Sequence, residues 1–90
     1  MAPVYLYTTR SCPYCTQAKY LLEHKGVSYR EIPVDGNPQL RLEMMNASGR
    51  RTVPQIWVGD THVGGCDDLY ALERSGQLDR LLAAVVRPSP

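Results

Sequence analysis

The stretch VYLYTTRSCPYC, residues 4–15, is the clearest indication of the fold because it joins a short apolar segment to a closely spaced cysteine pair. Residues 4–8 are apolar and β-prone, which predicts a buried strand. Pro13 then suits the first position of a helix, which places Cys12 at the N-cap. The helix keeps one apolar face as far as Gly26, a residue typical of a helix end. The chain therefore begins with a strand that leads directly into a helix opened by a cysteine.

The rest of the chain also alternates between predicted strands and helices. Asn37 and Pro38 form an N-cap and first-turn pair, and Gly-Asp-Thr at residues 59–61 is typical of a β-hairpin loop. The expected strands cover residues 4–8, 27–34, 53–58 and 62–63; the expected helices run from 13 to 26, from 38 to about 49, from after 65 to 76, and around 78–85. The order β-α-β-α-β-β-α-α predicts an α/β thioredoxin fold, a four-stranded mixed sheet with helices on both faces.

Length, charge and cysteine content narrow the class of protein. The 90 residues suit a single domain, predicted over residues 1–86, with residues 87–90 as a flexible C-terminal tail. The 10 basic and 9 acidic residues leave a net charge of +1, which argues against nucleic acid as the main partner. No apolar run approaches the ~20 residues of a membrane span, and no secretory signal pattern is present. Three cysteines fit a secreted disulfide framework poorly, so we expect a cytoplasmic protein without membrane association.

The motif Cys12-Pro13-Tyr14-Cys15 carries the predicted chemistry. An N-cap side chain faces the amides of the second and third helical positions, here Tyr14 and Cys15. These amides and the positive end of the helix stabilise a thiolate, so Cys12 is predicted to be the nucleophile, with Arg10 as a nearby positive charge. Cys15 lies one turn further in. It is predicted to be more buried and to resolve a mixed disulfide on Cys12.

Metal binding is the main alternative for a Cys-X-X-Cys pair. A structural zinc site needs four ligands, and Cys12, Cys15, Cys66 and His62 can be nominated. However, the chain has no second Cys-X-X-Cys, and Pro-Tyr between the cysteines suits a helix start better than a zinc knuckle. Because the pair follows a strand and opens a helix, we favour redox chemistry and expect no metal.

A proline precedes the third expected strand, in Thr52-Val53-Pro54. It cannot sit in a central strand of a sheet because it has no N–H to donate. A cis Val53–Pro54 bond at a turn would explain its place, whereas a trans proline at a strand start is the commoner arrangement. The residues alone leave both forms open and favour the trans form.

The segment GGCDD, residues 64–68, joins a strand to a helix. Its glycines let a ligand approach the backbone closely, and the amides of a helix N-terminus suit a carboxylate. Asp67 or Asp68 suits an ammonium group, so the segment could bind the α-amino acid end of a ligand. The alternative is a glycine turn followed by acids that cap the helix. Cys66 is interpreted as a small buried residue in preference to an oxidisable thiol.

Together these motifs resemble those of the glutaredoxins, and the similarity extends from Val4 to about Leu82. CPYC at 12–15 is the signature of the dithiol members, and TVPQI at 52–56 and GGCDDL at 64–69 follow at the family's spacing. Residues 64–72 are most similar to the bacterial glutaredoxin 3 subgroup. The resemblance implies a monomeric oxidoreductase that reduces protein disulfides and glutathione mixed disulfides. It implies glutathione as the reducing co-substrate, and ribonucleotide reductase is one of the family's protein substrates.

The resemblance also implies a role for each site residue. Cys12 forms the mixed disulfide with glutathione, and Cys15 resolves protein disulfides. The implied glutathione-binding residues are Arg10, Tyr14, Thr52, Val53, Pro54, Gly65, Cys66 and Asp67. Within that set, Val53 precedes a cis proline and offers its backbone to the cysteine part of glutathione, whereas residues 65–67 hold the γ-glutamyl end.

One position departs from the family pattern. Many members carry a lysine three residues before the first cysteine, and this chain has Thr9 there. Arg10 is adjacent and is the candidate to replace the missing charge.

Two other functions compete with a glutathione-dependent enzyme. The first is a redoxin that a flavin reductase recharges directly, which the acidic segment at 64–68 disfavours. The second is a binding protein that carries an iron–sulfur cluster between subunits through Cys12 and glutathione. Pro13 directly after Cys12 is expected to hinder access of a cluster.

Overall fold

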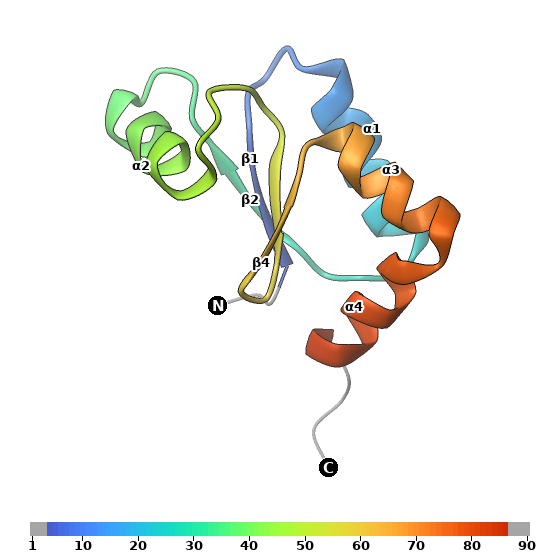
Figure 1. The fold of residues 1–90 in the computed structure, drawn as a ribbon. Coiled ribbons are helices and arrows are strands. Elements are labelled where there is room, and N and C mark those ends of the chain that lie inside the picture. Colours follow the sequence, from blue (N-terminus) through green and yellow to red (C-terminus); the bar gives the residue numbers. More distant parts are fainter. Residues whose placement is uncertain (1–3, 87–90) are drawn as a thin grey trace.

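The computed structural model describes residues 4–86, which form a four-stranded mixed sheet with helices on both faces (Figure 1). The strands are β1 (Val4–Thr8), β2 (Arg30–Pro33), β3 (Gln55–Val58) and β4 (Thr61–Gly64), and their order in the sheet is β2-β1-β3-β4. Strand β1 pairs in parallel with β2 and antiparallel with β3, and β3 and β4 form an antiparallel hairpin. The helices are α1 (Pro13–His24), α2 (Pro38–Ser48), α3 (Cys66–Ser75) and α4 (Gln77–Val86).

This arrangement confirms the predicted element order and fold. The predicted tail, residues 87–90, lies outside the described residues. Within residues 4–86, no helix is both long enough and apolar enough to cross a bilayer.

The larger apolar core lies between the sheet and three of the helices. Leu6 and Ile56 of the sheet pack against Leu22 of α1, Leu69 of α3 and Leu78 of α4, and all five side chains are fully buried. Helices α1, α3 and α4 accordingly lie together on one side of the sheet in Figure 1. Because α1 and α3 pack on the same face of the sheet through this shared core, the core fixes the position of their N-termini relative to each other.

Helix α2 covers the opposite face of the sheet (Figure 1). Its fully buried Met44 joins a second cluster with Tyr7 of β1 and Trp57 of β3. Trp57 also stacks on Tyr5 with the ring centroids 5.5 Å apart. Met44 and Trp57 are therefore packing residues of this second core.

Strand β2 begins three residues later than the sequence predicted. Helix α1 ends with Gly26 in the left-handed conformation (φ +72°), and the Val27 N–H donates to the Leu22 carbonyl at 3.1 Å. This bond completes a glycine-based helix cap, so the Val27 amide satisfies the helix end instead of the sheet. Val27 and Tyr29 still pack against the larger core, which explains why their apolar pattern looked like a strand.

Lys25 ties the end of α1 to the last two helices. Its ammonium group lies 2.6 Å from a carboxylate oxygen of Glu73 and 2.9 Å from one of Asp79, and only 18% of the side chain is exposed. The 12 residues of α1 span about 18 Å at 1.5 Å per residue, so these ion pairs lie roughly that far from the cysteines.

Candidate active site

The two close cysteines lie where β1 ends and α1 begins, as the sequence predicted. The end of β1 is anchored by the buried hydroxyl of Thr8, which donates to the Glu31 carboxylate at 2.7 Å. Lys19 of α1 donates to the same carboxylate oxygen at 3.0 Å. These two bonds lower the pKa of Glu31, the Thr8 hydroxyl having the larger effect. The network joins β1, β2 and α1 directly beneath the cysteine loop.

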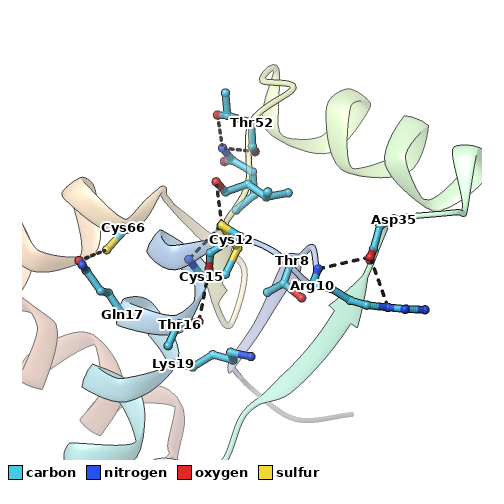
Figure 2. Close-up of a disulfide and its surroundings, with 12 residues drawn as sticks. Thr8, Arg10, Cys12, Cys15, Thr16, Gln17, Lys19, Asp35, Thr52 and Cys66 are labelled. Carbon is cyan, nitrogen blue, oxygen red and sulfur yellow. Dashed lines mark hydrogen bonds and ion pairs between the residues drawn. A yellow bond between two sulfur atoms is a disulfide. The ribbon is translucent and has the colours of Figure 1, made fainter.

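Cys12 is the N-cap of α1, and its sulfur accepts the Cys15 backbone N–H at 3.1 Å. In this structure Cys12 and Cys15 form a disulfide, with their Cα atoms 5.1 Å apart (Figure 2). Cys12 is half-buried, whereas only 1% of Cys15 is exposed. An amide aimed at the Cys12 sulfur, together with the positive helix end, stabilises a thiolate there once the disulfide is reduced. This geometry favours Cys12 as the attacking thiol and leaves the buried Cys15 as the candidate resolving thiol, so the two roles stay predictions.

The loop before β3 forms one wall beside the cysteines. The Val53–Pro54 peptide bond is cis, so the trans form favoured by the residues alone is wrong and the form implied by the family resemblance is correct. Strand β3 begins only at Gln55, two residues later than predicted, because the chain turns at the proline. The Val53 carbonyl oxygen lies 3.7 Å from the Cys12 sulfur, which brings this loop against the reactive atom (Figure 2).

A pocket of about 210 Å³ opens beside this wall. It is lined by Tyr14, Arg50, Thr52, Val53, Pro54, Gly65, Cys66, Asp67 and Asp68. Three segments distant in sequence thus meet here: the start of α1, the loop before β3 and the start of α3. Seven of the eight residues implied for glutathione binding lie in its lining, and Arg10 is the exception.

Arg10 faces away from the pocket. Its backbone N–H donates to the Asp35 carboxylate at 3.3 Å, and its guanidinium Nε lies 3.6 Å from the same oxygen. The side chain is 92% exposed. In Figure 2 the Arg10–Asp35 pair lies on the opposite side of the disulfide from Cys66. The structure therefore directs this charge toward Asp35, and a contact between Arg10 and a pocket ligand stays a prediction.

The far end of the pocket is the N-terminus of α3. Gly65 is the N-cap and supplies no side chain, but its own N–H donates to Asp68 Oδ2 at 2.9 Å. The guanidinium of Arg50 reaches the same oxygen at 3.0 Å. These bonds lower the pKa of Asp68, first through the Gly65 amide and then through Arg50. Gly64 has φ +113°, and a Cβ there would lie 2.4 Å from Asp68 Oδ2, so only glycine fits this close approach.

This end of the pocket therefore carries both kinds of charge-binding group. The first amides of α3 have no acceptor within the helix and suit a carboxylate. Asp67, in the same turn, is exposed and suits an ammonium group. An α-amino acid end carries both groups, and its binding here stays a prediction.

Arg50 and Asp68 belong to the site but were not assigned to it from sequence. The structure adds Arg50 because its side chain lines the pocket and pairs with Asp68. Asp68 was considered only as an alternative to Asp67. The sequence did contain a signal for Asp68. It lies at the third position of a helix whose N-cap is glycine, where an acidic side chain typically accepts the N-cap N–H as in a capping box.

Cys66 lines the pocket but is only 6% exposed, which matches its interpretation as a small buried residue. Its sulfur lies 3.9 Å from Gln17 Oε1. Burial, followed by the nearby Asp67 charge, raises the pKa of its thiol. Across residues 4–86, no three His, Cys, Asp or Glu side chains are grouped as metal ligands would be. The four residues nominated for zinc therefore do not form a centre.

A comparison with protein families matches residues 4–63 to the glutaredoxin family model. The chain is 62% identical over 84 residues to a glutaredoxin of Pseudomonas aeruginosa, covering 93% of this chain and 100% of that protein. It is 58% identical over 82 residues to glutaredoxin 3 of Escherichia coli, covering 91% of this chain and 99% of the other.

A solved structure gives the same result for the fold. The buckwheat glutaredoxin–glutathione complex is 27% identical and superposes with a TM-score of 0.89, covering 98% of this chain and 83% of that one.

Proposed function

Because the chain belongs to the glutaredoxin family, we propose that this thiol–disulfide oxidoreductase takes its electrons from glutathione and reduces both glutathione mixed disulfides and protein disulfides. The observation that carries the proposal is the pocket beside Cys12, whose far end pairs helix amides with an acidic side chain. Glutathione has a γ-glutamyl end with one carboxylate and one ammonium group, and its thiol lies in the middle of the molecule. A ligand of this form spans from the α3 N-terminus to the Cys12 sulfur.

The lining residues divide between the parts of glutathione. The amides of Cys66 and Asp67 receive the γ-glutamyl carboxylate, and the Asp67 side chain receives the ammonium group. The backbone of Val53 lies against the cysteine part, which agrees with its position 3.7 Å from the Cys12 sulfur. Tyr14 is 59% exposed at the mouth of the pocket, where its ring can flank the peptide. The glutathione complex of the buckwheat relative supports this ligand.

Reduction of a glutathione mixed disulfide needs Cys12 alone. The Cys12 thiolate attacks the glutathionyl sulfur, the substrate S–S bond breaks, and the substrate leaves as a thiolate that takes a proton from water. The Cys15 N–H, which donates to the Cys12 sulfur, stabilises the negative charge before attack and after release. A second glutathione thiolate then attacks the glutathione held on Cys12. Oxidised glutathione leaves, and the Cys12 thiolate is restored.

Reduction of a protein disulfide uses both cysteines. Cys12 attacks one sulfur of the substrate and forms a mixed disulfide, while the other substrate sulfur leaves as a thiolate. Cys15 then attacks Cys12, which releases the second substrate thiol and leaves the Cys12–Cys15 disulfide seen in this structure. Two glutathione molecules reduce that disulfide in turn. The proposed partners are thus glutathione and proteins with accessible disulfides, with the cytoplasm, where thiols are kept reduced, as the proposed location.

The test is turnover of a glutathione mixed disulfide of a small thiol, with glutathione, glutathione reductase and NADPH for recycling. We expect turnover that saturates in the mixed disulfide and disappears in Cys12→Ser, because Cys66, the other cysteine at the pocket, is buried and its pKa is raised by that burial. Lack of turnover by wild-type protein whose cysteines are free and reactive would contradict the proposal. Reduction of the Cys12–Cys15 disulfide by a flavin reductase without glutathione would then favour the competing redoxin.

A further inference from the structure

A buried amide side chain lies between the pocket wall and the outer strand β4. Gln55, the first residue of β3, is fully buried. Its Nε2 donates to the Thr52 carbonyl at 3.0 Å and approaches the Thr52 hydroxyl at 3.4 Å, two contacts that Figure 2 shows at Thr52. Its Oε1 lies 2.7 Å from His62 Nε2 on β4. The amide therefore connects a histidine remote from the cysteines to a residue that lines the pocket.

The hydrogen-bond chemistry determines the direction of this connection. The Thr52 carbonyl can only accept, so the Gln55 nitrogen must face Thr52 and its oxygen must face His62. His62 Nε2 must then carry a hydrogen and donate it to Gln55. The ring of His62 packs on Trp57 with centroids 4.6 Å apart, and this contact keeps Nε2 oriented toward Gln55 Oε1. Burial and then the Arg50 charge lower the pKa of His62, but Nε2 donates in both the neutral and the charged ring.

The Thr52–Val53 segment depends on this support because it lies outside the sheet. Strand β3 begins at Gln55, so residues 52 and 53 gain no ladder hydrogen bonds from it. Thr52 is also exposed. In addition, a hydroxyl that accepts from Gln55 keeps its own hydrogen for a group in the pocket. The amide thus holds the carbonyl of Thr52 and orients its hydroxyl as a donor.

We propose that Gln55 and His62 are positioning residues for the enzyme, which hold Thr52 and Val53 where the glutathionyl group of the substrate binds. This inference rests on the proposed function, since it assigns the residues to binding of that group. Neither residue lines the pocket, so both act through Thr52. Their loss should weaken substrate binding and leave the reactivity of Cys12 unchanged.

Two substitutions at one position separate the hydrogen bond from the shape of the side chain. His62→Leu leaves the buried Gln55 oxygen without a donor, so the amide is free to rotate away from Thr52. His62→Gln places an amide nitrogen about where Nε2 lies and restores the donor. Lys25→Met is the control, because it removes two ion pairs about one length of α1 away from the cysteines.

The first measurement is KM and kcat for the glutathione mixed disulfide, together with the rate of Cys12 alkylation against pH. For His62→Leu we expect KM to rise roughly three- to tenfold, as for one lost buried hydrogen bond, with an unchanged alkylation profile. His62→Gln and Lys25→Met should stay within about twofold of the wild type. An unchanged KM in His62→Leu, equal damage in His62→Gln, or a shifted alkylation profile would each overturn the proposal.

The second measurement uses the unmodified protein and needs neither turnover nor a foldable variant. Ring ¹⁵N shifts of His62 at neutral pH should show the Nε2–H tautomer, and a coupling across the hydrogen bond should link Nε2 to the Gln55 side chain. The Nδ1–H tautomer would overturn the proposal by itself. If the wild type does not turn over the mixed disulfide, the proposed function fails on that assay. The positioning role of Gln55 and His62 is then judged by the His62 tautomer alone.

Discussion

Removing the carboxylate of Asp68 should destabilise the protein by loosening the N-terminus of α3. Asp68 accepts the Gly65 N–H at 2.9 Å and the Arg50 guanidinium at 3.0 Å. Asp68→Ala removes both bonds, whereas Arg50→Met removes only the ion pair and leaves the backbone cap in place. The two variants therefore separate the helix cap from the ion pair.

The expected size follows from the exposure of each partner. Loss of a cap hydrogen bond at a helix N-terminus costs about 1 kcal/mol, and loss of a negative charge in the first turn costs roughly 0.3–1 kcal/mol more. The ion pair adds little, because the two side chains are 49% and 45% exposed and solvent screens them. We expect Asp68→Ala to lower the free energy of unfolding by about 1.5 kcal/mol and the Tm by roughly 6–12 °C. Arg50→Met should cost about 0.5 kcal/mol or less.

The assay is thermal and urea unfolding followed by circular dichroism, on protein with both active-site cysteines in the same redox state. Helix loss should be cooperative in all variants, so the midpoints are directly comparable. A Tm of Arg50→Met as low as that of Asp68→Ala would contradict this assignment. The ion pair, and not the cap, would then hold the start of α3.

The pH dependence gives a second check on the same residue. Folding lowers the pKa of Asp68 from its ordinary value of 3.8, so the carboxylate contributes its full stabilisation above that value. The contribution is lost as the pH falls through the folded pKa, where Asp68 is protonated. The difference in unfolding free energy between wild type and Asp68→Asn should therefore be constant near neutral pH and shrink below about pH 3.8. A difference that grew in acid would contradict this assignment.

Three further predictions concern the thiols and the pocket. Cys15→Ser should keep reduction of a glutathione mixed disulfide and lose reduction of a protein disulfide, measured on both substrates; equal loss of both would remove the division of labour between the cysteines. Asp67→Ala should raise the KM for the glutathione mixed disulfide roughly three- to tenfold, because the ammonium group loses its acceptor, without moving the alkylation pKa of Cys12. A moved pKa with an unchanged KM would show that the γ-glutamyl end binds elsewhere. Cys66 should react with iodoacetamide at pH 7 at least about tenfold more slowly than reduced Cys12, because burial raises its pKa; comparable labelling by mass spectrometry would contradict its buried position.

The local signals in the sequence were reliable wherever neighbouring residues alone decide the conformation. Cys12 and Asn37 cap α1 and α2 as predicted, each followed by proline at the first helical position. A capping side chain needs only the amides two or three residues ahead, so the pattern identifies it without knowledge of the fold. The strand starts were less accurate, because the Val27 amide and the turn at Pro54 are engaged outside the sheet.

The same distinction between local patterns and tertiary contacts applies to the site. Local sequence patterns were enough to predict the chemical groups of the site: a thiol at a helix N-cap, a second thiol one turn further in, and a glycine-rich helix start with acids. Which residues line one pocket depends on tertiary packing, since the loop before β3 and the start of α3 meet the start of α1 only in the folded protein. Arg10 points to Asp35 and Arg50 points to Asp68 for the same reason. The direction of a long charged side chain depends on partners about 18 to 25 positions away in the chain, which no local pattern encodes.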